Sequence, residues 1–150
     1  MNYKELSGYE KIKLILENYT SLADRLNYLK TNIDNVSLKH SYRHDGTVKT
    51  FYSEYLSDIE KIEDIKEKRL MTIDLLEYFL HLVDSGINYL KDCHFKHYEI
   101  IELYYIKGMK LKQIANKLEI NPVTVSKNKD KLIQEIAYFH FDDILESFTW

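Results

Sequence analysis

Cysteine is nearly absent from this 150-residue chain, and with Cys93 alone no disulfide can form within it. The sequence also has no signal-like apolar run, and no stretch approaches the roughly 20 apolar residues of a membrane span. These absences predict a protein of the reducing cytoplasm without a membrane partner. Proline and glycine are scarce, with one and four residues, which argues against a loop-rich chain and favours helices.

Motifs of catalysis and metal binding are missing as well. The sequence contains neither a glycine-rich phosphate loop nor a nucleophile elbow, so we expect no enzyme activity. Cys93, His94 and His97 form C-H-x-x-H, but a closed zinc site needs four ligands and no second cluster has matching spacing. We therefore expect no metal and no cofactor. Cys93 is interpreted as a packed thiol, and His40 and His44 as polar loop residues.

Two long stretches carry apolar residues at alternating spacings of three and four, the pattern of helices that pack along one stripe. The first predicts a helix from about Tyr3 to Asn32, and the second continues to Leu90. Ser85-Gly86 lies inside the second stretch, where a kink or a break is an open alternative. The stripes consist of Ile12, Ile15, Tyr19, Leu22, Leu26, Leu29 and Ile33, and of Ile73, Leu76, Leu80, Val83, Ile87 and Leu90.

A polar connection with an Asp45-Gly46 turn signal separates the two stripes. We therefore predict an antiparallel helical arm over residues 1–92, with a role in interaction or dimerisation. The stripes can satisfy each other within one chain or form a coiled coil between two chains. A monomer and a homodimer both remain open.

The charge is unevenly distributed along the chain. The net charge is −3, yet residues 105–133 hold seven lysines against two acidic residues, and residues 134–150 hold four acidic residues and no basic one. A basic window inside an acidic chain fits either a surface that faces a polyanion or a solvated helix face.

The basic window has the spacing of a helix-turn-helix. An amphipathic helix, closed by Gly108 in a left-handed conformation, is predicted by Phe95, Tyr98, Ile101 (or Ile100) and Tyr104 or Tyr105. A short helix follows from Leu111 to Leu118. A third helix then begins with an N-cap and a proline at its first position.

Five residues explain why these helices would hold together. Ala115 is small enough for a close helix crossing, and Leu118 and Ile120 flank the turn. Val125 is the inward anchor of the third helix, which Asn121 caps. The predicted fold class is thus all-α, with long N-terminal antiparallel helices followed by a C-terminal helix-turn-helix domain over residues 93–150.

This region resembles a known family. The run EIIELYYIKGMKLKQIANKLEINPVTVSKNKDKL is similar to the promoter-reading region four of sigma factors. The remainder, with long paired helices in front and the continuation SKNKDKLIQEIA, resembles the phage and prophage late-gene transcription regulators of the ArpU and RinA type. The resemblance implies a sequence-specific regulator whose partner is double-stranded DNA, and it leaves a contact with RNA polymerase open. It rests on Leu103, Tyr105, Gly108, Ile114-Ala115, Leu118 and Thr124-Val125.

The resemblance also implies which residues meet DNA. The base-contacting positions of the family fall on Pro122, Val123 and Lys127, with a recognition helix over about residues 122–131. Glu119 stands where the turn commonly has glycine. The full predicted DNA-binding set is Lys110, Lys112, Gln113, Asn121, Pro122, Val123, Thr124, Ser126, Lys127 and Lys131.

Two other functions remain as alternatives. The first is a DNA-recognition subunit for phage packaging, similar to a small terminase. The second is a helical protein-interaction module in which the basic window contacts an acidic protein. The acidic, aromatic segment LIQEIAYFHFDDILESFTW is expected to fold back on the long helices, with a dimer or polymerase contact as the alternative.

Overall fold

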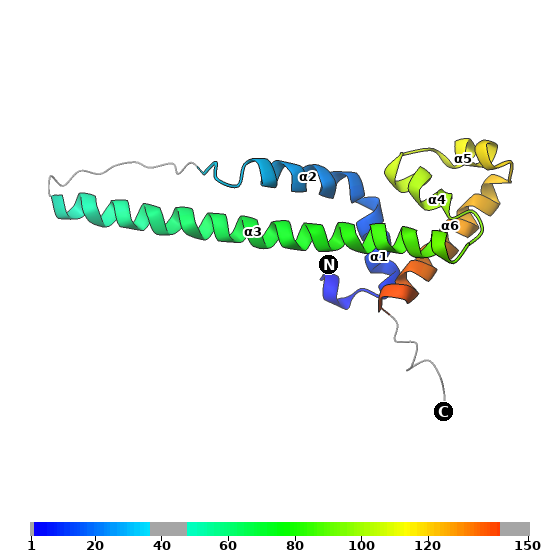
Figure 1. Cartoon of the computed structure of the whole chain (residues 1–150), viewed down its shortest axis with the longest axis horizontal. Coiled ribbons are helices and arrows are strands. Elements are labelled where there is room, and N and C mark those ends of the chain that lie inside the picture. The colour runs from blue at the N-terminus through cyan, green and yellow to red at the C-terminus, as the bar shows by residue number, and fades with distance from the viewer. Residues whose placement is uncertain (1, 37–47, 142–150) are drawn as a thin grey trace, which may run out of the picture. The chain divides into compact units, whose positions relative to one another are not determined.

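The computed structural model describes residues 2–36 and 48–141, with side chains for 2–36 and 55–141. The described residues contain helices and no strand, which confirms the predicted all-α class (Figure 1). None of these helices has the length and hydropathy to cross a membrane. The elements are η1 (Tyr3–Glu5), α1 (Gly8–Glu17), α2 (Tyr19–Thr31), α3 (Val48–Asp92), α4 (Glu99–Ile101), the π-helical turn η2 (Glu102–Ile106), α5 (Leu111–Leu118) and α6 (Pro122–Phe141).

Internal contacts divide the chain into two compact units. The first unit combines residues 1–23 with residues 78–150, and the second spans residues 24–77. The apolar patterns of the sequence instead predict a division after residue 92. The difference arises because α1 packs along α6 and so joins the start of the chain to its C-terminal helices.

The core of the first unit forms around α6, which contacts α1, α4 and α5. Burial of each large aliphatic side chain there contributes about 1.5–3 kcal/mol. The residues that are fully withdrawn from water include members of both predicted stripes and of the predicted helix-turn-helix. They are Ile12, Leu16, Val83, Leu90, Ile100, Ile101, Ile114, Val125, Ile133 and Ile136.

The first predicted helix is wrong in its extent. Ser7 starts α1 through a capping box, in which its Oγ accepts from the Glu10 N–H and the Glu10 carboxylate accepts from the Ser7 N–H. Asn18 then separates α1 from α2. Its side-chain amide donates to the Leu14 carbonyl at 2.8 Å, a local bond that competes with the helical ladder.

The long helix α3 continues through Ser85 and Gly86 without a break. The buried Gly86 faces α6 instead. Beyond α3, the predicted helix start at Phe95 is wrong. The Phe95 N–H donates to the Leu90 carbonyl, and His94 (φ 56°) and His97 (φ 59°) adopt left-handed conformations that turn the chain before α4.

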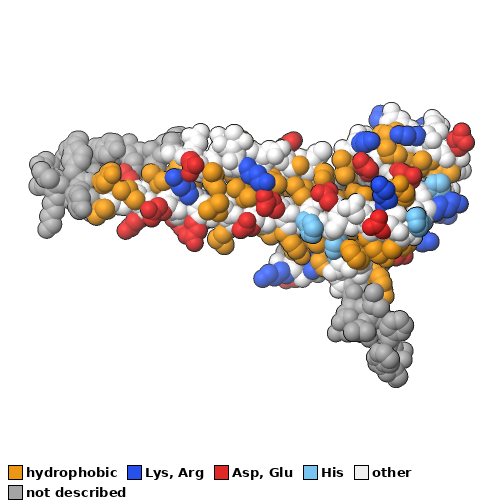
Figure 2. Space-filling model, in the orientation of Figure 1, with side chains coloured by type: hydrophobic (Ala, Val, Ile, Leu, Met, Phe, Trp, Pro, Cys, Tyr) orange, Lys and Arg blue, Asp and Glu red, His pale blue; other side chains and the backbone are white. Residues whose placement is uncertain are grey.

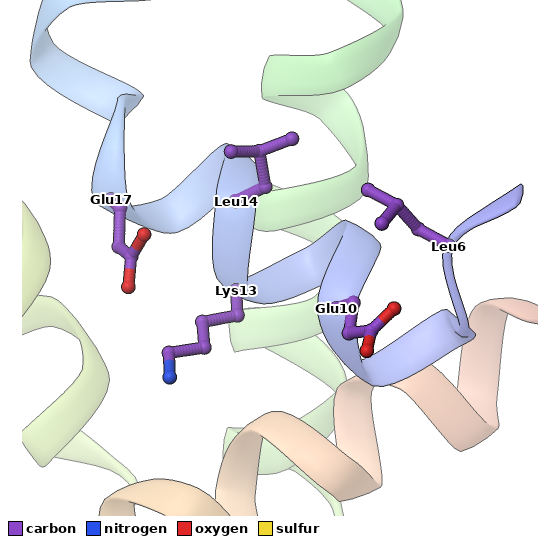
Figure 3. A pocket seen from close by; sticks show the side chains of 5 residues that line it. All are labelled: Leu6, Glu10, Lys13, Leu14 and Glu17. Carbon is purple, nitrogen blue, oxygen red and sulfur yellow. The ribbon is translucent and has the colours of Figure 1, made fainter. Parts of the chain in front are cut away.

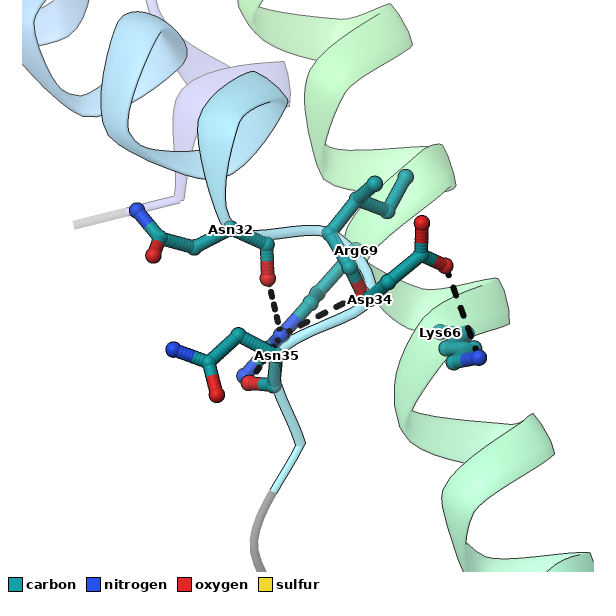
Figure 4. Close-up of polar contacts among 6 residues, drawn as sticks. Asn32, Asp34, Asn35, Lys66 and Arg69 are labelled. Carbon is teal, nitrogen blue, oxygen red and sulfur yellow. Dashed lines mark hydrogen bonds and ion pairs between the residues drawn. The ribbon is translucent and has the colours of Figure 1, made fainter.

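In the second unit, the end of α2 lies against residues 66–77 of α3 in the predicted antiparallel sense. Lys30 pairs with Glu77 at 2.7 Å. Arg69, which interrupts the apolar stripe, donates through Nη1 to the carbonyls of Asn32 at 2.6 Å and Asn35 at 2.9 Å (Figure 4). This arginine therefore ties the turn that follows α2, through the carbonyls of Asn32 and Asn35, to α3.

Candidate nucleic-acid interface

The helix α5 begins at an extended Lys110. A lysine side chain has no acceptor for the free amides of a first turn, so it cannot act as the usual cap. Gln113 supplies part of that function, because its Oε1 accepts from the Lys110 N–H at 2.9 Å. The helix is strongly amphipathic: Ile114 and Ala115 are buried, whereas Lys112 and Gln113 are exposed. Ala115, the small residue predicted at the helix crossing, is thus buried.

Glu119 forms the turn between α5 and α6. It has a left-handed backbone (φ 57°, ψ 44°), the conformation for which glycine is the usual residue. The Ile120 N–H donates back to the Ala115 carbonyl at 3.0 Å, which closes the end of α5. The turn therefore forms with glutamate and retains backbone strain at one residue.

The start of α6 agrees with the sequence analysis. Asn121 caps the helix, since its Oδ1 accepts from the Val123 N–H at 2.9 Å, and Pro122 occupies the first helical position. Val125 is fully buried and Ala115 is 3% exposed, so both predicted anchors lie in the core. Gly108 has the predicted left-handed conformation, with φ 68°.

The predicted contact residues lie almost entirely on the surface of the first unit. Val123, an apolar side chain, is 60% exposed. Ser126 is half-buried, and the Oε1 of Gln113 is already engaged in the α5 cap. Figure 2 shows Lys and Arg side chains around α5 and the segment that leads into it. The exposed members are Lys110, Lys112, Gln113, Asn121, Pro122, Val123, Thr124, Lys127 and Lys131.

Two charged residues of α6 are engaged with the body of the unit. The Lys129 ammonium lies 4.4 Å from the centroid of the Tyr104 ring, a cation–π contact. The Tyr9 hydroxyl donates to Asp130 Oδ1 at 3.4 Å. Sequence reasoning missed both contacts, because Tyr9 lies 121 residues from Asp130 and nothing local marks the pairing.

Beneath this part of α6, the π-helical turn η2 presents Tyr104 and Tyr105 with their rings edge to face, 4.8 Å apart. Burial, and then the nearby Glu17 carboxylate, raise the pKa of the Tyr105 hydroxyl well above its usual value. The phenol therefore stays neutral at any physiological pH, which suits packing under Lys129 rather than proton transfer.

The structure places some of the residues that the sequence suggested for metal and thiol roles. Within residues 2–36 and 55–141, no group of three or more His, Cys, Asp or Glu side chains could hold a metal ion. Cys93 is exposed, so its interpretation as a packed thiol is wrong; it directly follows the last residue of α3. His40 and His44 lie outside the described residues.

Comparison with known proteins finds no family model, no curated protein and no solved structure that matches this chain.

Proposed function

We propose that the chain is a sequence-specific, double-stranded DNA-binding regulator of transcription that inserts the first turns of α6 into the major groove. The observation that carries this proposal is the outer surface at the start of α6. There an apolar side chain, a hydroxyl and an amine lie exposed at Val123, Thr124 and Lys127. The buried anchors Ala115 and Val125 hold this surface in a defined orientation.

The proposed contacts divide by chemistry. Val123 would meet a thymine methyl group, and Lys127 would donate to guanine acceptors. The Oδ1 of Asn121 is used by the helix cap, so its amide NH₂ is the group directed to DNA. Lys110, Lys112 and Lys131 would contact phosphates, which supply affinity without sequence information.

A protein-interaction module is the second candidate, and one observation favours it. Asp130 lies between Lys127 and Lys131 in the sequence and is exposed, so it adds a negative charge close to the two amines. A mixed surface of this kind also suits a protein partner. Salt-dependent binding to duplex DNA distinguishes the candidates, because phosphate contacts release counterions and a protein-interaction module has no reason to bind a duplex.

Selection of bound sequences from a random duplex pool tests the proposal with the full chain. We expect a defined sequence to be enriched. Lys127→Ala should then reduce discrimination between the selected site and a scrambled one, whereas Lys112→Ala should weaken binding to both alike. Lys4→Ala, an exposed lysine of η1, is the matched control. A pool that shows no enrichment would reject sequence-specific recognition.

A further inference from the structure

An apolar groove lies along α1 in the first unit, away from the proposed DNA-binding residues. Ile15 is buried at the groove, whereas Leu14 is 41% exposed. The side-chain NH₂ of Asn18, a polar lining residue, donates to the Leu14 carbonyl at 2.8 Å. The groove, here called the α1 groove, is lined by Tyr3, Leu14, Ile15, Asn18, Leu22 and Phe79.

Leu14 also lines a second depression on α1, whose other lining residues are Leu6 and the charged Glu10, Lys13 and Glu17 (Figure 3). The α1 groove is the more apolar of the two, because its lining holds no charged residue. An apolar groove of this kind is typical of a site that another segment covers.

The chain leaves α6 at the edge of this groove. The Lys11 ammonium lies 5.2 Å from the centroid of the Phe141 ring and 5.3 Å from that of Tyr3. Tyr3 in turn packs on Phe79, with ring centroids 5.2 Å apart, and both rings line the groove. One lysine therefore links the end of α6 to the groove wall.

We propose that residues 142–150, which lie outside the described residues, occupy the α1 groove of their own chain. Their sequence is DDILESFTW. The two carboxylates directly after Phe141 match the charge of Lys11, and the apolar residues that follow match the lining of the groove. Nine residues span up to about 30 Å when extended, against about 15 Å for a ten-residue helix such as α1.

The same segment of a second copy is the rival occupant. A tether of a few residues gives an effective concentration in the millimolar range, above the concentration of the protein in a dilute solution. The short distance between Phe141 and the groove wall therefore favours binding within one chain.

Trp150 makes the proposal directly testable, because it is the only tryptophan of the full chain. If the segment is bound, selectively excited Trp150 emits to the blue of a free tryptophan amide and resists quenching by acrylamide. Leu14→Glu should shift the emission to the red and increase quenching several-fold, and Leu14→Gln should do so to a smaller degree. Leu75→Glu is the matched control, since Leu75 is a 52% exposed leucine outside the groove.

Three results would overturn the proposal, which is independent of DNA binding. Trp150 emission in the unaltered chain could match that of a free tryptophan amide. Leu75→Glu could change the emission as much as Leu14→Glu. Finally, protection of Trp150 could rise with protein concentration together with a dimeric mass, which would assign the groove to a second copy. Circular dichroism verifies that the helices of each variant are retained.

Discussion

A Cβ atom added to Gly86 would lie 2.6 Å from Cγ2 of Ile136, so α3 and α6 cross at a separation that only glycine permits. Alanine is normally the better helix former, by about 1 kcal/mol. Here the fully buried Ile136 cannot move aside at low cost. The glycine that suggested a break in α3 is thus explained by a helix crossing.

Gly86→Ala should consequently destabilise the first unit, by about 1–3 kcal/mol in the free energy of unfolding. Ile136→Ala removes the clashing methyl group, so the double variant should be less destabilised than the sum of the two single changes. Denaturant unfolding measures both. If Gly86→Ala proved neutral or stabilising, the close crossing would be refuted.

In the turn between α5 and α6, a substitution should raise the stability of the protein, whereas Gly86→Ala lowers it. A left-handed backbone costs a residue other than glycine about 1–2 kcal/mol, and the greater freedom of glycine in the unfolded chain offsets part of this. Glu119→Gly should stabilise the protein by about 0.5–1 kcal/mol. Lys117→Gly, in the last turn of α5, should instead destabilise it by a similar amount. Thermal unfolding of the two variants, compared with the unaltered chain, tests this contrast.

Arg69 should stabilise the end of α2. Its guanidinium donates to the Asn32 carbonyl at 2.6 Å and to the Asn35 carbonyl at 2.9 Å. Arg69→Ala should lower the local stability of the second unit by about 1–2 kcal/mol, because charged donors form the stronger hydrogen bonds. Native-state hydrogen exchange along α2 detects the loss. Arg25→Ala, an exposed arginine of α2, should leave exchange almost unchanged.

His140 gives the first unit a pH dependence. Burial lowers the pKa of its imidazole, the Leu82 carbonyl at 2.7 Å raises it, and His81 lowers it. The net pKa lies below the ordinary value of 6.5. The unfolded chain therefore takes up a proton on this group before the folded chain does. The stability is highest above pH 6.5 and is lost as the pH falls through 6.5 toward the folded pKa.

His140→Gln should flatten this dependence, whereas His94→Gln, at an exposed histidine, should not. Unfolding free energies measured on either side of the ordinary pKa separate the two variants. Equal pH profiles for His140→Gln and the unaltered chain would contradict the assignment.

Signals from residues close together in the sequence predicted the start of α6 and the core between α5 and α6. Asn121 and Pro122 are neighbours, and the spacing from Ala115 to Val125 lies within one short segment, so capping and helix periodicity were sufficient. The apolar stripes likewise identified buried residues such as Ile12 and Leu90. The spacing of the first stripe continues on both sides of Asn18, whereas the predicted single helix is interrupted there.

Features that depend on distant residues were not predictable. The Gly86 contact needs Ile136, and the Asp130 bond needs Tyr9. The turn before α4 places His94 in a left-handed conformation that its residue type favours only weakly. The observed units differ from the predicted division because α1 packs on α6. The periodicity of an apolar stripe does not indicate which helix the stripe will contact, so this packing could not be predicted.

The salt dependence of duplex binding by the full chain tests the proposed function most directly. Each lysine that contacts a phosphate should contribute about 0.9 to the slope of log affinity against log salt. Lys112→Ala and Lys131→Ala should each reduce the slope by about that amount, and Lys4→Ala should not. The absence of duplex binding at low ionic strength, or a slope unchanged in both variants, would contradict DNA recognition through α5 and α6.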